Sequence, residues 1–207
     1  MPVRVHRAVA GLGLGLVVAA ALVLPSAAVS QPSVGPNLVK NGGFEQPAVA
    51  SGGYLLVSVG QSMAGWKVVG AAGNVAPISG AYKQNGFSFT AKAGKQWLDL
   101  TGGTSNQQIG VAQTVKTTPG ASYRLSFAVG NVVDSAGVFG TTSTVNVIVN
   151  GHKLLAATNK AGGKLQAWKT FSLTVKATTA ATTLEFQNGD SGSDNDNGLD
   201  AVSLTRR

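Results

Sequence analysis

The chain has 207 residues, with 28 glycines, no cysteine and 12% charged residues, and 16 Lys and Arg against 8 Asp and Glu give a formal net charge of +8. Without cysteine there are no disulfides and no thiol chemistry, so stability must come from a hydrophobic core, with or without a bound ion. The basic residues are scattered, which favours mild attraction to anionic wall polymers or phospholipid headgroups over a nucleic-acid footprint. A purely solubilising role explains the charge equally well.

The first thirty residues have the layout of a secretory signal peptide. Arg4 and Arg7 precede an uninterrupted apolar run over residues 8–24, and the small residues Ala28 and Ser30 suit cleavage after residue 30. The alternative is an uncleaved membrane anchor, but a spanning helix needs about 20 apolar residues. We therefore expect a signal peptide over residues 1–30 and a secreted, extracellular protein, without a membrane span in the mature chain.

The remainder is predicted to be a short linker, residues 31–36, and a single domain, residues 37–207. Apolar residues recur at every second position in several segments, which is typical of half-buried strands. Asn150-Gly151 separates two such segments and predicts a hairpin, because both residues accept positive φ. The segments with this alternation are 122–131, 144–149, 152–158, 168–177, 182–188 and 198–204.

About nine to eleven short strands are expected in all, separated by turns rich in Gly, Asn, Ser and Pro. A turn is expected within residues 117–123, which contain Pro-Gly, and a surface loop in the glycine-rich residues 51–60. This pattern predicts one all-β domain, a two-sheet antiparallel β-sandwich.

Catalytic residues are scarce. After loss of the signal peptide His152 is the only histidine, and it follows a predicted turn, so a Ser-His-Asp triad is disfavoured. A glycosidase needs two carboxylates facing each other across a cleft, and no pair of acids has a recognisable spacing. The sequence therefore predicts a protein that is not an enzyme, unless Asp99 shares a cleft with another acid.

Four of the eight acids lie between residues 190 and 200. The segment is not an EF-hand loop, because Thr205 stands where the loop would need its twelfth-position Glu. For Asp190, Asp194 and Asp196 a flexible polar loop is the favoured interpretation.

Asp200 differs from these three, because it shares parity with Val202 and Leu204 and is expected on the core side of the last strand. A buried carboxylate needs a cation or hydrogen-bond donors. If the first and last strands adjoin, Glu45 arrives beside Asp200, and the two carboxylates would form a structural Ca²⁺ site. The alternative is that a lysine or backbone N–H groups neutralise Asp200.

A sugar site typically presents an aromatic ring near polar amides, because a pyranose has an apolar face and a polar rim. Trp66 and Trp168 open predicted strands and are expected in the core. Trp97 shares a face with Asp99 and is equally suited to core and site. The candidate ligand-binding residues are Trp97, Tyr82, Asn106, Gln108 and Asn131.

Five segments, in this order, resemble the bacterial choice-of-anchor domains and the related plant cell-wall domain-of-unknown-function family. They are NLVKNGGFEQP (37–47), AGWKVVG (64–70), KQWLDLTG (95–102), GVAQTVKTTPGASYRLSFAVGN (110–131) and NGLDAVSL (197–204). Both families are similar to galactose-binding-like, carbohydrate-binding-module jelly rolls.

The resemblance implies a secreted, non-catalytic jelly roll associated with cell-wall or extracellular polysaccharide. It also implies a structural calcium joining the N-terminal acidic segment to an Asp of the last strand, here Glu45 and Asp200. One departure is Ala201, which stands where relatives have a second Asp or Asn. The alternative function is a structural or adhesive extracellular protein that self-associates or binds other proteins.

Overall fold

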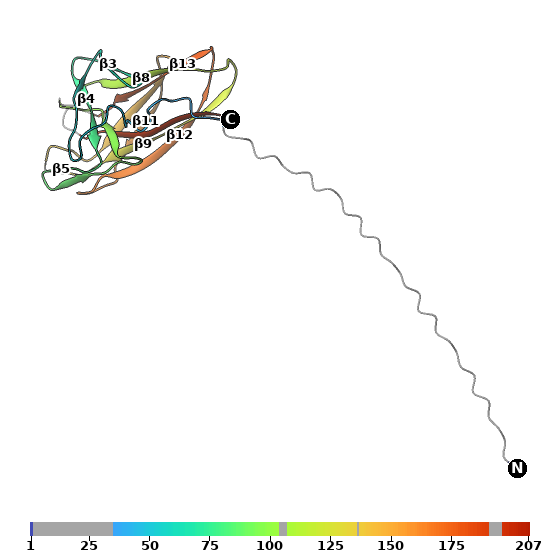
Figure 1. Cartoon of the computed structure of the whole chain (residues 1–207), viewed down its shortest axis with the longest axis horizontal. Coiled ribbons are helices and arrows are strands. Elements are labelled where there is room, and N and C mark those ends of the chain that lie inside the picture. Colours follow the sequence, from blue (N-terminus) through green and yellow to red (C-terminus); the bar gives the residue numbers. More distant parts are fainter. Residues whose placement is uncertain (2–34, 104–106, 136, 191–195) are drawn as a thin grey trace. The chain divides into compact units, whose positions relative to one another are not determined.

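The computed structural model describes Met1 and residues 35–103, 107–135, 137–190 and 196–207. The predicted signal peptide beyond Met1, most of the predicted linker, Asn106 and Asp194 lie outside these residues. All the strands belong to the compact unit Pro32–Arg207 (Figure 1). Every regular element that the structure describes is a strand, so the all-β prediction is confirmed, and none of the described residues forms an apolar helix of membrane-spanning length.

The strands form two six-stranded antiparallel sheets and a separate hairpin. Sheet 1 has the order β1 (Val57–Ser58), β4 (Asn74–Ser79), β7 (Gln96–Asp99), β14 (Gly198–Arg206), β9 (Ser122–Asn131) and β12 (Ala167–Lys176). Sheet 2 has the order β11 (His152–Asn159), β10 (Ser143–Val149), β13 (Ala181–Asn188), β8 (Ile109–Lys116), β3 (Trp66–Gly70) and β2 (Ser62–Met63). The hairpin pairs β5 (Tyr82–Gln84) with β6 (Phe87–Phe89). The predicted two-sheet antiparallel sandwich is therefore confirmed.

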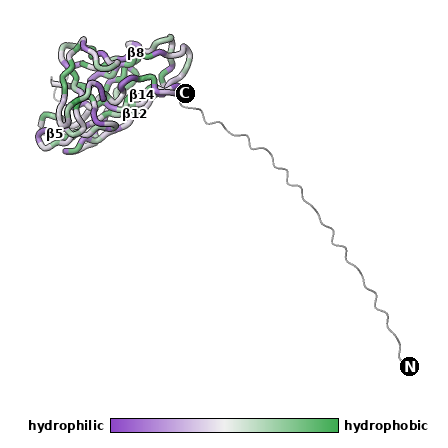
Figure 2. Tube along the Cα trace, in the orientation of Figure 1, coloured by the Kyte–Doolittle hydropathy of each residue, from purple (hydrophilic) through white to green (hydrophobic). Residues whose placement is uncertain are grey.

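The main core lies between the two sheets and is built by strand alternation. Val145, Val147 and Val149 of β10 face Leu125 and Phe127 of β9 in one buried cluster. Figure 2 shows hydrophobic and hydrophilic residues interspersed along the strands instead of separated into long runs. This pattern places one face of each sheet in the core and leaves the other face available.

The predicted hairpin at Asn150-Gly151 is confirmed, with φ of 50° and 81° at the two turn residues. The predicted turn within residues 117–123 is also present, closed by a hydrogen bond from Ala121 N to Thr118 O. The glycine-rich residues 51–60 are only partly a loop, because β1 lies within them and Tyr54 bridges to Ile78 of β4.

Candidate functional site

A pocket lies on the outer face of sheet 1, away from the main core. In β7, Leu98 belongs to the main core, and its neighbours Trp97 and Asp99 lie on the opposite face, as the alternation predicts. Ile78 pairs with Trp97 and Ala76 pairs with Asp99, so β4 extends the same surface. These four residues form the floor of the pocket.

The β5–β6 hairpin covers this floor and builds a second hydrophobic cluster with it. Asn85 and Gly86 make the hairpin turn with φ of 51° and 80°. Phe89 stacks on Trp97 at 6.0 Å between ring centroids and 19° between planes, and Phe139 packs edge-on against Phe89 at 5.2 Å. The aromatic walls therefore support one another, which fixes the shape of the pocket.

The pocket has a volume of about 310 Å³. It is lined by Tyr54, Ala76, Ile78, Tyr82, Gln84, Phe89, Trp97, Asp99, Gly102, Gly103, Val138, Phe139 and Asp196. A larger hollow of about 990 Å³ lies beside Glu45, and none of the described residues that line it is aromatic. Only the first therefore offers rings to the apolar face of a ligand.

Trp97, which lines the pocket, has a fully buried side chain, and its indole N–H is without a hydrogen-bond partner among the described residues. By contrast, Nε1 of the neighbouring Trp168 donates to Thr90 O at 2.8 Å. A buried donor without a partner is costly, so the Trp97 N–H is suited to a water or a ligand oxygen.

Two tyrosines form the outer wall. Tyr54 is half exposed and meets Tyr82 edge-on at 5.8 Å. The Tyr82 hydroxyl donates to Gln84 Oε1 at 2.7 Å. Partial burial raises the pKa of the Tyr82 phenol, and Tyr54 and Asp99 raise it further.

Asp99 is buried, and its Oδ1 accepts hydrogen bonds from Thr101 N at 2.9 Å, Thr101 Oγ1 at 2.7 Å and Asn197 N at 3.4 Å. Burial raises the pKa of this carboxyl from 3.8 to about 6, although these hydrogen bonds act in the opposite direction. Asp99 is therefore positioned rigidly and can accept from or donate to a ligand hydroxyl near neutral pH.

Asp196 is a pocket residue that the sequence did not identify. Asp190 and Asp196 lie outside the strands, between β13 and β14, as a polar loop requires, but hydrogen bonds from the protein hold both side chains. Asp196 is buried, with Oδ2 accepting from Val132 N at 2.9 Å, and Asp190 Oδ2 accepts from Thr144 N at 2.7 Å. The signal in the sequence that could have identified Asp196 is its position two residues before Gly198, which begins the last strand and pairs with Asp99.

The predicted ligand residues separate into two groups. Trp97 and Tyr82 line the pocket. Gln108 is exposed just before β8, outside the pocket lining. Asn131 is fully buried, where its Nδ2 donates to Ala161 O at 2.9 Å and its Oδ1 accepts from Ser143 Oγ at 2.8 Å. The structure therefore gives Asn131 an interior, not a surface, position.

A second unused polar group lies one strand away from the pocket floor. Both amide atoms of Gln166 are buried without a partner among the described residues. The amide packs on Gly130 and Gly198, where a Cβ would overlap Gln166 Nε2. Because Gly198 pairs with both Asp99 and Gly130, this amide extends the polar part of the outer face.

The segment around Glu45 docks against the last strand, as the sequence suggested. The bend uses positive φ at Asn41 (50°) and Phe44 (54°), and the Phe44 ring is buried 5.5 Å from Trp66. Val202 N donates to Gly42 O at 2.8 Å, and a Cβ at Gly42 would overlap Val202 O. Glycine is therefore needed at position 42 for the approach that brings Glu45 to β14.

Each carboxylate of the Glu45–Asp200 pair is held by backbone N–H groups. Asp200 Oδ2 accepts from Lys92 N at 2.8 Å and Ala93 N at 3.0 Å, and Glu45 Oε1 accepts from Lys95 N at 2.8 Å and Gln96 N at 3.0 Å. Burial raises the pKa of Asp200 to about 6 against these hydrogen bonds, and the charge of Glu45 raises it further.

These residues fit a hard cation. Backbone N–H groups of Lys92, Ala93 and Ala201 hold Asp200, as the alternative expected, and among the described residues the charged neighbour that affects the pKa of Asp200 is the carboxylate of Glu45. Ca²⁺ takes carboxylate and carbonyl oxygens, and would remove this repulsion. No group of three or more Asp, Glu, His or Cys side chains forms in the described part of the chain, so carbonyls or waters would complete the shell.

Asp200 is buried, but the prediction that it lies on the core side of the last strand is wrong. Leu199, not Asp200, joins Val202 and Leu204 in the main core. The pairing of β14 with β9 shifts between Asp200 and Ser203, and Ala201 has a φ of 52°, so a bulge reverses the alternation. Asp200 pairs with Ala128 on the outer face of sheet 1 and is covered there by the loop at Lys92.

Residues 37–204 match the model of the family described as Protein of unknown function (DUF642), and the chain belongs to this family. The domain-of-unknown-function resemblance is therefore confirmed, and the match does not extend to the choice-of-anchor label. No curated protein matches the chain.

Several solved structures are similar to this chain. One is the CBM22-1 xylan-binding domain from Paenibacillus barcinonensis Xyn10C, at 17% identity and a TM-score of 0.44, covering 77% of this chain and 97% of that domain. Another is the Clostridium thermocellum xylanase 10B CBM22-1-GH10 structure, at 18% identity and a TM-score of 0.47, covering 84% of this chain and 29% of that chain. A third is the Arthrobacter globiformis T6 isomaltodextranase, at 15% identity and a TM-score of 0.44, covering 76% of this chain and 24% of that chain. The chain thus spans about a quarter of these two enzyme chains.

Proposed function

We propose that the protein is a secreted, non-catalytic domain that binds a carbohydrate in the pocket on the outer face of sheet 1. The observation that carries the proposal is the buried, unpartnered indole N–H of Trp97 in a pocket that also holds four other aromatic rings and two carboxylates. Rings suit the apolar face of a pyranose, and fixed carboxylates and an N–H suit its hydroxyl rim.

The dimensions favour a short ligand. Ligand pockets typically span roughly 300–1,000 Å³, and about 310 Å³ is at the lower end of that range. The β5–β6 hairpin closes one side of the floor, so a chain end fits better than the middle of a long polymer. Asp99 and Asp196 disfavour an acidic sugar here, which leaves a neutral sugar as the expected ligand of the pocket.

Two tryptophans provide a matched test. Trp97→Phe removes a donor that has no partner among the described residues, so it should weaken binding; because the indole is fully buried, the smaller ring should also cost about 1–3 kcal/mol of stability. Trp168→Phe removes the hydrogen bond to Thr90 O, so it should cost about 1–3 kcal/mol of stability and leave binding intact. Affinity electrophoresis on neutral polysaccharides, followed by calorimetry with oligosaccharides, measures binding. Equal binding by both variants would contradict the proposal.

Secretion and association with the cell wall are parts of the same proposal. They rest on the signal-peptide pattern of residues 1–30 and on the sugar-suited pocket. Mass spectrometry of the protein from cells and from culture medium should find a mature N-terminus at Gln31 in the medium. A protein that keeps residues 1–30 and stays with the membrane fraction would contradict secretion.

A glycosidase is a second candidate, because Asp99 shares the pocket with Asp196 and has a pKa raised by burial to about 6. A carboxyl with a raised pKa suits a general acid. Hydrolysis of chromogenic glycosides by the wild type, lost in Asp99→Ala, would establish this candidate. Turnover that is absent, or unchanged by the substitution, would remove it.

Self-association is the alternative to sugar binding, and it would use the exposed apolar side chains at the rim of the pocket. Tyr54, Leu56 and Val138 are each half exposed, and Leu55 is 41% exposed beside them. An apolar rim can contact a sugar or a second copy of the chain. Sedimentation over a range of concentrations separates the two, because a monomer at all concentrations leaves the rim to the ligand.

A further inference from the structure

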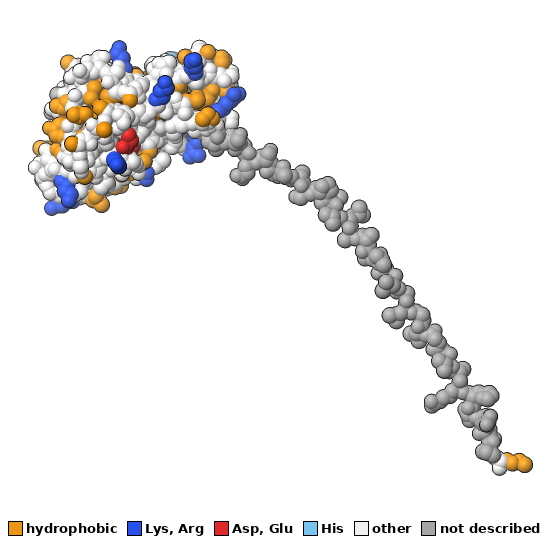
Figure 3. Space-filling model, viewed as in Figure 1, with side chains coloured by type: hydrophobic (Ala, Val, Ile, Leu, Met, Phe, Trp, Pro, Cys, Tyr) orange, Lys and Arg blue, Asp and Glu red, His pale blue; other side chains and the backbone are white. Residues whose placement is uncertain are grey.

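The positive and negative side chains of the domain are segregated between surface and interior. Among the described residues, all fourteen Lys and Arg side chains are exposed, whereas each of the seven described Asp and Glu side chains is at least partly buried. On the face shown in Figure 3, Lys and Arg are spread over the surface and acidic atoms surface in one small area. Among the described residues the exposed charged side chains are therefore all positive, whereas the pocket is lined by two carboxylates.

Four of the fourteen described Lys and Arg residues lie at one end of sheet 1. Arg124 lies between Thr174 of β12 and Thr205 of β14, and Lys176 pairs with Ser122, one step further along the same face. Arg206 and Arg207 lie at the same end: Arg207 N donates to Ser122 O, and Arg206 pairs with the core residue Tyr123, so its parity is opposite to that of Arg124. We call Arg124, Lys176, Arg206 and Arg207 the basic end.

Hydroxyl groups continue this surface towards the middle of the sheet. Ser126 lies between Ser172 and Ser203 in the register of the three strands, directly next to the row that contains Arg124. Residues 122–128, 170–176 and 202–207 contain no Asp or Glu. Arg124, Lys176 and these hydroxyls thus share a face whose three strand segments have no acidic side chain to compete for an anion.

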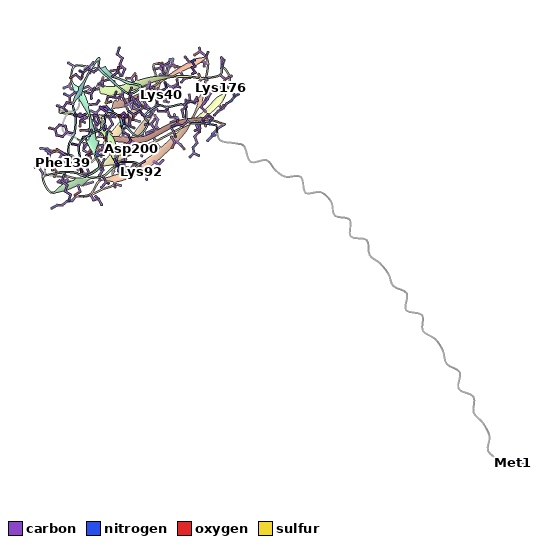
Figure 4. The ribbon with its side chains drawn as sticks, in the orientation of Figure 1. Met1, Lys40, Lys92, Phe139, Lys176 and Asp200 are labelled. Atoms are coloured by element: carbon purple, nitrogen blue, oxygen red, sulfur yellow. The ribbon has the colours of Figure 1, made fainter. Side chains whose placement is uncertain are left out.

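The basic end and the pocket lie at opposite ends of sheet 1. Gly198 is beside Asp99, and Arg206 is eight residues further along β14, which corresponds to roughly 25 Å of strand. Figure 4 shows the same order, with Phe139 of the pocket at one end, Asp200 in the middle and Lys176 at the other end. A ligand on the basic end is therefore independent of the pocket.

We propose that the basic end is a second binding surface, and that its partner is an acidic polysaccharide with regularly spaced carboxylates. Arg and Lys bind carboxylates, and the Ser and Thr rows accept and donate hydrogen bonds to sugar hydroxyls. The large hydrophobic side chains that are exposed in the domain (Tyr54, Leu55, Leu56, Val138, Leu154 and Leu165) all lie outside the three strand segments of this surface. The surface thus lacks the apolar anchors that membrane insertion uses and the exposed rings that stack on nucleotide bases.

The test compares one polymer in two charge states. The protein is passed over immobilised polygalacturonate and over the same polymer after methyl esterification, which removes the charge and keeps the backbone. Retention on the acidic form, lost on the ester and lost near 0.5 M salt where screening is strong, is expected. Equal retention on both forms would overturn the proposal.

Paired variants locate the surface. Arg124→Gln with Lys176→Gln removes two charges from the basic end, and Lys67→Gln with Lys153→Gln removes two from sheet 2. The first should weaken polygalacturonate binding roughly fivefold or more, and the second less than twofold. An equal loss in both would show that only net charge matters. Stronger binding to phosphatidylserine vesicles or to single-stranded DNA than to polygalacturonate would also overturn the assignment.

Discussion

Glu45 and Asp200 both adjoin Gly43, because a Cβ built at Gly43 would be 3.9 Å from Glu45 Oε1 and 3.7 Å from Asp200 Oδ1. The two residues are 155 positions apart in the sequence, near the beginning and the end of the domain. Because each is already held by backbone N–H groups, they form a rigid pair of like charges. Such a pair favours a cation and would couple the two ends of the chain through it.

Calcium should therefore stabilise the protein through Asp200. At a concentration about 100 times its dissociation constant, Ca²⁺ should raise the thermal midpoint by roughly 5–10 °C relative to chelator. The increase should be lost in Asp200→Asn and Glu45→Gln, but kept in Glu185→Gln, which removes a carboxyl on sheet 2. A calcium response that survives in Asp200→Asn, or that is absent from the wild type, would refute the ion site.

The general architecture could be predicted because it depends on local patterns. Alternation placed Val145, Val147 and Val149 in the core, and positive φ at Asn150 and Gly151 follows directly from their residue types. The pocket could be predicted only in part. Trp97 and Asp99 share a face by alternation, but nothing local indicates that the β5–β6 hairpin folds over them.

Other errors have identifiable physical causes. The alternation rule misplaced Asp200 because it assumes an unbroken strand, and the bulge at Ala201 has no glycine to mark it. The burial of Asp196 could not be predicted because the backbone N–H of Val132 that holds it comes from a segment 64 residues earlier. Asn131 is a candidate ligand residue in the sequence but a buried amide in the structure, because its partners Ala161 and Ser143 come from segments 30 and 12 residues away.

The stability of the protein without calcium should fall as the pH rises from about 4 to about 6. Asp99 has a pKa of about 6 in the folded protein against a reference of 3.8, so between these values the folded state holds a proton that the unfolded state has lost. The stabilisation is present below about pH 4, and on the order of 3 kcal/mol from this group is lost by about pH 6.

Urea unfolding across this range, in wild type and Asp99→Asn, isolates the contribution of Asp99. Asparagine can still accept the hydrogen bonds from Thr101 and Asn197 on its oxygen, so the variant should fold. Its stability should vary less steeply with pH than that of the wild type. Parallel pH profiles would show that Asp99 does not have the raised pKa.

Gly94 should be needed for the position of Glu45. It has a φ of 67°, and a Cβ there would overlap Glu45 Oε1 and Cδ. Gly120 has a similar φ of 78° but no atom within 4 Å of a Cβ, so it is a matched control. Gly120→Ala should cost only the strain of positive φ, about 1 kcal/mol.

Gly94→Ala should cost more than that, about 2–3 kcal/mol, and should also reduce the calcium-dependent increase in the thermal midpoint, because Glu45 must move. Chemical denaturation of both variants with and without calcium measures the two effects. Equal losses in the two variants, with an unchanged calcium response, would show that Glu45 adapts without cost.

Ala201 should be a position where glycine improves on the natural residue. Its φ of 52° is unfavourable for alanine, and the bulge that it forms turns Asp200 away from the main core towards Glu45. Ala201→Gly should therefore raise the free energy of unfolding by about 0.5–1 kcal/mol. Ala156→Gly, in the regular part of β11, should lower it by a similar amount, because glycine weakens a strand of ordinary φ. Unfolding measurements that give both substitutions the same sign would mean that Ala201 is not under strain, and the reversal of alternation would then need another cause.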